Sequence, residues 1–214
     1  MSKLKKMTLA LVTTGLLSGG AVQAALFDRG SGLIYDDVLN ITWLSDANYA
    51  LTSGYTYWNL FYNSHGRMSF SEANTWVTNL SYGGYDDWRL PSALCSVNCN
   101  QISEMGHMFY NNLGASAGSS ILSGSNTANL ALFTNLKSYA YWSGTESLYP
   151  NSAFYFDANT GLESFDYMNS KFYAWAVRPG DVAAAVPEPE IYAMLLAGLG
   201  LLGVMARRRK KKSA

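Results

Sequence analysis

The stretch GGYDDWRLPS, residues 83 to 92, indicates how the centre of this chain folds. Its large apolar side chains alternate with polar ones, so we expect Trp88 and Leu90 to be buried on one side. Arg89 lies between them and is expected to pair with one of the chain's carboxylates, and Pro91 is expected to end the strand. We therefore interpret this segment as part of the scaffold of the fold.

The region around this stretch is rich in aromatic residues. Residues 25 to 186 contain all six Trp, fourteen of the fifteen Tyr and all nine Phe. Aromatic side chains bury a large area each, and Trp142 and Trp175 are expected to anchor a sheet. A composition of 49% hydrophobic and 14% charged residues favours a packed core over disorder. We expect one domain, because no internal linker suggests two.

Two short helices are predicted from capping and periodicity. The first has Ser69 as its N-cap and Glu72 three residues later, and it should stop before the glycine pair 83–84. Its inward face is expected to comprise Ala73, Trp76, Val77 and Leu80. The second is predicted from Ser103 to Asn112, with Met105, Met108 and Phe109 facing inward. A weaker third turn is predicted at residues 129–136.

The last third of the chain is predicted as an antiparallel meander. Its three aromatic-rich strands are Asn151 to Phe156, Leu162 to Tyr167 and Phe172 to Val177. An opening hairpin is predicted as well, because the turn from Asp28 to Gly32 repeats the chemistry of the turn from Asp157 to Gly161. An early hairpin, two helices and a late sheet predict an α+β domain.

The two ends of the chain carry positive charge, while the body is acidic. The net charge is +3 over residues 1–24, −7 over residues 25–186 and +4 over residues 187–214. A basic start, an apolar run over residues 7–17 and a small residue at Ala24 are typical of a signal peptide cut after residue 24. We therefore expect the Sec translocon and signal peptidase as partners, and we do not expect nucleic acid.

The C-terminal segment, residues 187–214, is predicted to be a membrane-directed tail. A short tether over residues 183–186 leads to Pro187, Glu188 and Pro189, and an apolar helix is predicted over residues 191–206. Sixteen helical residues reach about 24 Å and would barely cross a hydrocarbon core. The basic run 207–212, which begins with Arg207, Arg208 and Arg209, should stay on the cytoplasmic side.

Val-Pro-Glu-Pro, an apolar helix and an Arg-rich end together resemble the PEP-CTERM sorting tail. The resemblance implies recognition and cleavage near Pro187 to Pro189 by an exosortase in a Gram-negative bacterium that makes extracellular polysaccharide. The chain would pass through an inner-membrane intermediate and then reach the cell surface or the medium. A plain single-span anchor is the alternative.

Four further segments resemble the Lcl C-terminal-like domain family: GGYDDWRLPS (83–92), YWSGTES (141–147), SAFYFDANTG (152–161) and YAWAVRPG (173–180). The resemblance covers most of residues 25–182 and implies a C-type-lectin-like α+β fold, related to the domain of sulfatase-modifying enzymes. Some members of the family bind sulfated or other polysaccharides. The motif residues that we expect to be structural are Trp88, Arg89, Leu90, Pro91, Trp142, Trp175 and Arg178.

Candidate metal and disulfide positions are few. An exported chain favours a disulfide between Cys95 and Cys99 over a zinc site shared with His65 and His107. His107 is expected at a helix surface or core edge with a local hydrogen bond. Calcium is the ion that suits acidic groups, and its candidate ligands are Asp86, Asp87, Asp157, Glu163 and Asp166. Turn formation is the preferred role for these aspartates, so no cofactor is predicted.

No catalytic motif is recognisable, so we do not expect an enzyme. The sequence favours an exported binding or structural module of the exopolysaccharide or biofilm matrix, with exposed Tyr and Trp rings that stack on sugars. The alternative is an enzyme that uses a carboxylate pair on polysaccharide or envelope proteins.

Overall fold

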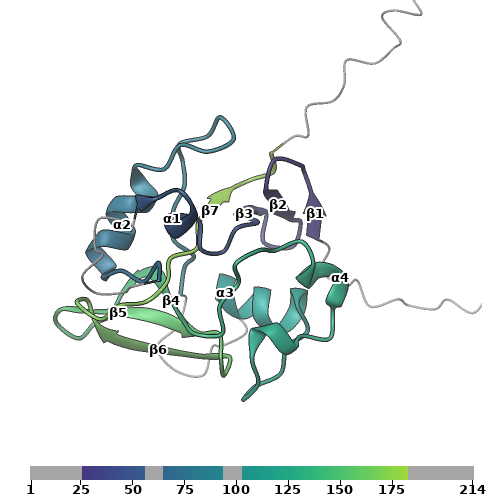
Figure 1. The fold of residues 1–214 in the computed structure, drawn as a ribbon. Helices are drawn as coiled ribbons and strands as arrows, with labels where there is room; N and C mark the ends of the chain where they lie inside the picture. The colour runs from purple at the N-terminus through teal and green to yellow at the C-terminus, as the bar shows by residue number, and fades with distance from the viewer. Residues whose placement is uncertain (1–25, 56–64, 94–102, 183–214) are drawn as a thin grey trace, which may run out of the picture.

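The computed structural model describes residues 26–55, 65–93 and 103–182 of the chain, and these residues form two antiparallel sheets (Figure 1). One sheet has the order β1-β2-β3-β7 and the other the order β4-β5-β6. The strands are β1 (Leu26–Asp28), β2 (Leu33–Asp36), β3 (Ile41–Leu44), β4 (Ala140–Glu146), β5 (Ser152–Asp157), β6 (Leu162–Tyr167) and β7 (Val177–Pro179). The predicted α+β class is confirmed.

Short helices connect the sheets. They are α1 (Tyr49–Thr52), α2 (Phe70–Thr78), α3 (Glu104–His107), the π-helix η2 (Met108–Asn112), the 3₁₀-helix η3 (Ile121–Ser123) and α4 (Thr127–Leu130). The α3–η2 segment contacts both sheets, because Phe109 packs on Phe156 of β5 and Asn112 bonds to Asp36 of β2. The sequence predicted two helices and a weaker third turn, so the prediction was incomplete: it did not include α1 and η3.

The helix signals of the sequence are confirmed where capping decided them. Ser69 and Glu72 form a reciprocal capping box at the start of α2, and the predicted inward residues of this helix are buried. The helix ends at Thr78, five positions before the first glycine of the pair. Ser103 caps α3 by accepting a hydrogen bond from the Gly106 N–H group, and the predicted helix continues as a π-helix. The weaker helical turn predicted at residues 129–136 was wrong beyond residue 130, because α4 ends at Leu130.

The two predicted turns use the same chemistry. The Asp28 side chain accepts a hydrogen bond from the Gly30 N–H group at 2.8 Å, and the Asp157 side chain accepts one from Asn159 at 2.9 Å. Gly161 closes the second turn with a φ of 79°, and a Cβ there would lie 2.5 Å from the Tyr110 hydroxyl. Only glycine fits this position without displacing the aromatic ring.

The predicted strand from Phe172 to Val177 was wrong. The third strand of the sheet that contains β5 and β6 is β4, which pairs with β5. Residues 172–177 instead run between the two sheets. Its residues hydrogen-bond to a series of different partners: Phe172 to Met68, Tyr173 to Ala140 and Trp142, Ala176 to Leu44, and Val177 to Arg89. The segment is extended, but because it changes partner at almost every step it forms a strand only from Val177 onward.

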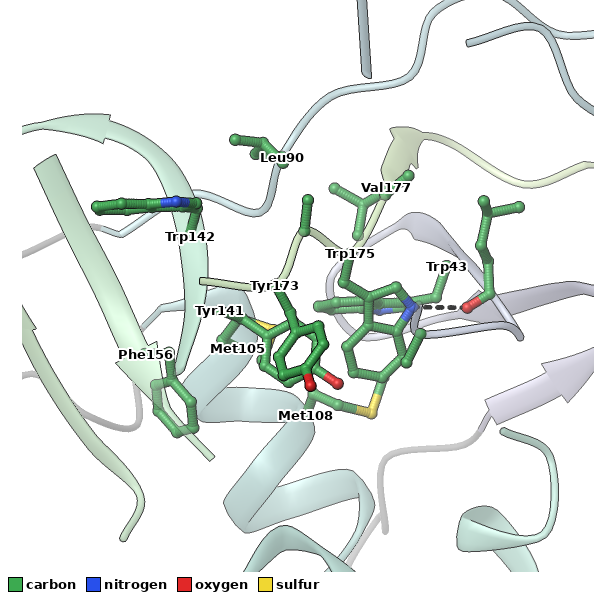
Figure 2. Close-up of a cluster of buried hydrophobic side chains, with 14 of the residues drawn as sticks. Trp43, Leu90, Met105, Met108, Tyr141, Trp142, Phe156, Tyr173, Trp175 and Val177 are labelled. Atoms are coloured by element: carbon green, nitrogen blue, oxygen red, sulfur yellow. Dashed lines mark hydrogen bonds between the residues drawn. The ribbon is translucent and has the colours of Figure 1, made fainter. Parts of the chain in front are cut away.

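The core lies where this linking segment passes between the sheets. Trp175 is fully buried, and its ring centroid lies 4.8 Å from that of Trp43 and 5.9 Å from that of Tyr141 (Figure 2). Its indole N–H group donates a 2.7 Å hydrogen bond to the Leu44 carbonyl. Trp142 is also fully buried, so the predicted role of both tryptophans as anchors is confirmed.

Several predictions fall outside the described residues. These are the signal peptide with its cut at Ala24, the cysteine pair Cys95 and Cys99, and the tail with Pro187, Glu188, Pro189 and the predicted helix 191–206. Within residues 26–55, 65–93 and 103–182, no helix is long and apolar enough to span a bilayer.

Candidate functional site

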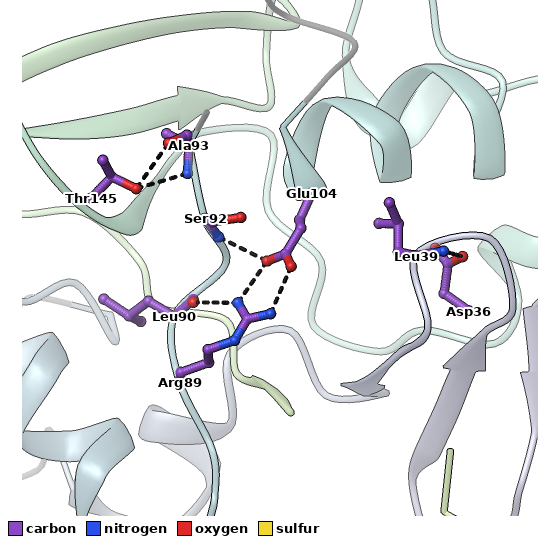
Figure 3. A network of polar contacts seen from close by, with 8 residues as sticks. All are labelled: Asp36, Leu39, Arg89, Leu90, Ser92, Ala93, Glu104 and Thr145. Atoms are coloured by element: carbon purple, nitrogen blue, oxygen red, sulfur yellow. Dashed lines mark hydrogen bonds and ion pairs between the residues drawn. The ribbon is translucent and has the colours of Figure 1, made fainter. Parts of the chain in front are cut away.

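The GGYDDWRLPS segment is joined to helix α3 by a partly buried ion pair. Arg89 donates two hydrogen bonds to Glu104 at the start of α3, at 2.7 and 2.6 Å (Figure 3). Glu104 also accepts from the Ser92 N–H group at 2.7 Å. Trp88 and Leu90 on either side of Arg89 are buried, as predicted.

The strand that Pro91 was expected to end is absent. Arg89 makes a single isolated bridge to Val177, and no longer ladder forms around it among the described residues. Pro91 is buried, and its carbonyl accepts a hydrogen bond from the Gly144 N–H group at 2.8 Å. Next to it, the Thr145 hydroxyl bonds to both backbone groups of Ala93. The segment thus tethers β4 to α3 and acts as a scaffold.

Arg178 forms the second ion pair of the motif set. It donates hydrogen bonds of 2.7 and 3.0 Å to Asp87, and its guanidinium lies 3.9 Å from the ring centre of Tyr85. The hydrogen bond from Arg178 holds the pKa of the Asp87 carboxyl below its ordinary value. Asp87 is therefore a partner in an ion pair and is not free to bind calcium.

This ion pair predicts a loss of stability in acid. Because the pKa of Asp87 is lower in the folded state, its contribution is present above the ordinary carboxyl value of 3.8 and is lost as the pH falls through the folded value. At pH 7, Asp87→Asn should lower the free energy of unfolding by about 1 kcal/mol, since the Asp87 side chain is 44% exposed. Urea unfolding at neutral and acidic pH should show the two proteins converging in acid. A difference that grows in acid would contradict the assignment.

The other proposed calcium ligands do not converge. Asp157 uses both carboxylate oxygens within its turn, to Asn159 and to the Thr160 hydroxyl. Strand alternation places Glu163 on the opposite face of the sheet from Asp166. Burial raises the pKa of Glu163. In the part of the chain that the structure describes, no group of three His, Cys, Asp or Glu side chains could hold a metal ion.

The two histidines lie in different environments. His65 is exposed, while His107 is buried at the core edge, where its Nε2 atom lies 3.8 Å from the Asp36 carboxylate. Asp36 is fully buried and accepts hydrogen bonds from Asn112 and from two backbone N–H groups. The core-edge position of His107 is confirmed, but the expected local hydrogen bond is not made by its Nε2 atom.

An open groove with a mixed polar and apolar lining lies between α2 and β4. It consists of two adjoining hollows of about 450 and 270 Å³ that share Asn74 and Thr78 of α2. The first hollow is also lined by Phe70, Ser71, Thr75, Glu146 and Met168. The second is also lined by Val77, Arg89, Leu90, Ser92, Gly144 and Thr145. Two of the four sequence motifs, GGYDDWRLPS and YWSGTES, thus form part of its wall.

The groove offers neutral hydrogen-bonding groups beside apolar side chains. Its polar lining consists mainly of hydroxyl and amide side chains, and its apolar lining includes the buried residues Phe70 and Leu90. The charge of Arg89 is balanced by Glu104, so Glu146 carries the remaining charge among the lining groups. The sequence did not reveal this groove, because the polar face of α2 is typical of any surface helix.

Two antiparallel sheets, linking helices and this groove define the body as an α+β domain with an open surface site. The chain belongs to the Lcl C-terminal domain family, whose model matches residues 32–178. All seven motif residues from Trp88 to Arg178 fall within this match, so the resemblance stated from the sequence is confirmed.

A second family model, the PEP-CTERM protein-sorting motif, matches residues 185–210. The match includes Pro187, Glu188, Pro189 and the arginines 207–209, and it marks the chain as an exported protein that an exosortase processes. The motif indicates export toward the cell surface of a Gram-negative bacterium. No curated protein and no solved structure gives a significant match to the chain.

Proposed function

We propose that the body is a non-catalytic, C-type-lectin-like module that binds exopolysaccharide outside the cell after its tail has been removed. The observation that carries this proposal is the groove between α2 and β4, which presents hydroxyl and amide groups beside apolar side chains. Sites for sugars need few charges and several well-placed polar groups around an apolar surface. The PEP-CTERM tail supports the location, because it directs the chain to the compartment where extracellular polysaccharide lies.

The shape of α2 suits an elongated ligand. Phe70, Asn74 and Thr78 recur at every fourth position, so they follow one face of the helix over about 12 Å. The body carries a net charge of −7, and the groove itself exposes Glu146. Polyanions are repelled by such a surface, so we propose a neutral polysaccharide as the ligand.

Exposed aromatic rings lie on β6 and in the loop before β5, and the residue after β6, Met168, lines the groove. Tyr149 and Phe165 stack with centroids 4.7 Å apart and an interplanar angle of 17°, and Tyr167 next to Met168 is 67% exposed. These rings supply the flat apolar faces on which sugar rings pack. The exposed tryptophans that the sequence led us to expect are not found, since every Trp within the described residues is buried.

Asn74→Ala is expected to weaken polysaccharide binding about tenfold, because the groove loses an amide. Asn79→Ala is the matched control. Asn74 is the central residue of α2 and Asn79 directly follows the helix, and both donate to the carbonyl four residues earlier, at 3.0 and 2.7 Å. Only Asn74 lines the groove. Calorimetric titration of the processed protein with polysaccharide from its own host should separate the two variants.

Two results would contradict the proposal as a whole, and a third would exclude the groove as the binding site. The first is a glycan array that stays blank with and without calcium, together with no heat of binding to the host polysaccharide. The second is the release of new reducing ends during incubation, lost in Glu146→Gln, because the protein would then be a hydrolase. Equal binding by the Asn74→Ala and Asn79→Ala variants would exclude this groove as the site.

A further inference from the structure

The two outer strands of the four-stranded sheet place the two ends of the body at the same end of the sheet. Leu26 of β1 pairs with Asp36, Asp36 with Ile41, and Ile41 with Pro179 of β7. Leu26 and Pro179 therefore lie in one row across the sheet, three strand spacings or about 14 Å apart. The segment that leads to the sorting tail therefore leaves the sheet at the same end at which β1 begins, with β2 and β3 between the two strands.

The chain after β7 is fastened to the body as far as Val182. The Gly180 N–H group donates to the Asn40 carbonyl, and the Thr42 hydroxyl donates to the Gly180 carbonyl, both at 2.8 Å. Arg29 donates two hydrogen bonds to Asp181, at 2.9 and 2.6 Å. Val182 is only 2% exposed and belongs to the core. We call residues 180–182 with these contacts the C-terminal clasp.

The clasp leaves little chain between the folded body and the sorting motif. Four residues, 183–186, separate Val182 from Pro187. The five steps along the chain from Val182 to Pro187 span at most about 18 Å even when fully extended. A folded body of this length has a radius of gyration of about 15 Å, which corresponds to a sphere roughly 39 Å across. The body is therefore wider than the tether is long.

From this geometry we infer that the clasp limits how far the folded body can stand from the site that the sorting peptidase cuts. The membrane-embedded peptidase then lies opposite the end of the sheet marked by the row of Leu26, Asp36, Ile41 and Pro179. Residues 183–186 act as a spacer that keeps the folded body off that enzyme. The inference rests on processing of the tail by an exosortase.

A deletion of residues 183–185 tests the spacer. It should slow conversion of precursor to processed protein about tenfold in a pulse-chase experiment in the native host, because the folded body would then abut Pro187. Replacing the same three residues with Gly-Ser-Gly keeps the length and should keep the wild-type rate. Wild-type processing of the deletion variant, or slow processing of the length-matched variant, would overturn the inference.

Opening the clasp tests the role of the fold. In the deletion background, Asp181→Ala with Val182→Ser should restore processing about threefold, because it frees two further residues as spacer. Opening a different ion pair by Asp87→Ala is the matched control and should restore nothing. Absence of rescue, or equal rescue by the control, would overturn the role of the clasp. Each precursor should resist added protease, which shows that its body is folded.

A change in the motif itself separates this inference from the sorting assignment. Glu188→Ala leaves the spacer and the clasp intact, and it should block processing if an exosortase recognises Pro-Glu-Pro. Normal processing of that variant would overturn the sorting assignment, whereas a blocked Glu188→Ala with an unaffected deletion variant would overturn the spacer alone.

Discussion

Trp175→Ala is expected to lower the free energy of unfolding by about 4 kcal/mol, since large aromatic side chains removed from cores cost this much. The ring is fully buried between the two sheets and touches aromatic rings from both, including Trp43 and Tyr141. Its loss creates a cavity and also leaves the Leu44 carbonyl without its 2.7 Å indole donor. Urea unfolding followed by tyrosine fluorescence and circular dichroism measures the change.

Two further variants calibrate this result. Tyr167→Ala removes an aromatic side chain that is 67% exposed, and it should change the free energy of unfolding by less than about 0.5 kcal/mol. Trp175→Phe retains much of the packing but loses the indole N–H group, so it should fall between the other two. Similar losses for Trp175→Ala and Tyr167→Ala would contradict a core centred on Trp175.

The second large effect is expected at the ion pair between Arg89 and Glu104. Arg89→Ala should cost about 2–3 kcal/mol, because it leaves the Glu104 carboxylate with the single donor Ser92 in a largely buried position. The Glu104 side chain is 12% exposed and that of Arg89 is 39% exposed, so the loss should stay below that of a fully buried pair. Chemical denaturation at neutral pH provides the measurement.

Lys171→Ala is the matched control for this ion pair. Lys171 bonds to Glu72 at the same 2.6 Å N–O distance, but both side chains are more than 40% exposed. Water screens such a pair, and its loss should cost no more than about 1 kcal/mol. The double variant with Arg89 and Glu104 both replaced by Met should be more stable than Arg89→Ala, because no buried charge is left unpaired. Equal losses for Arg89→Ala and Lys171→Ala would show that burial of the pair contributes nothing.

Local signals in the sequence predicted the elements whose cause is local. The capping box of Ser69 and Glu72 fixed the start of α2, because both of its hydrogen bonds lie within four residues. The turns at Asp28 and Asp157 followed from side chains that bond to the backbone two residues later. The apolar pattern of α2 and α3 correctly indicated which side chains are buried.

Prediction failed where a segment depends on several distant partners. The segment from Phe172 to Val177 is as aromatic as a strand, yet it bonds to Met68, β4, β3 and Arg89 in turn. Strand propensity measures how well side chains pack on a pleated surface, and it carries no information about which strand lies beside them. For the same reason β4 was not predicted as the partner of β5.

The candidate site was only partly accessible from the sequence. The ion pair of Arg89 was predicted without its partner, because thirteen carboxylates in the body were equally eligible. The groove needs α2 beside β4, two segments about 70 residues apart, so no local pattern could reveal it. Among the calcium candidates, Glu163 and Asp166 lie three positions apart on β6, so the alternation of side chains along the strand directs them to opposite faces of the sheet.

The sequence by itself determined the sorting motif, the family and the chemistry of caps and turns, since each of these can be recognised from short stretches of the chain. The tertiary structure decided which carboxylate Arg89 meets, how Trp175 joins the two sheets, where the groove lies and that both ends of the body lie at the same end of one sheet. These features depend on contacts between residues up to 150 positions apart, and such contacts form only when the buried aromatic side chains find a common packing.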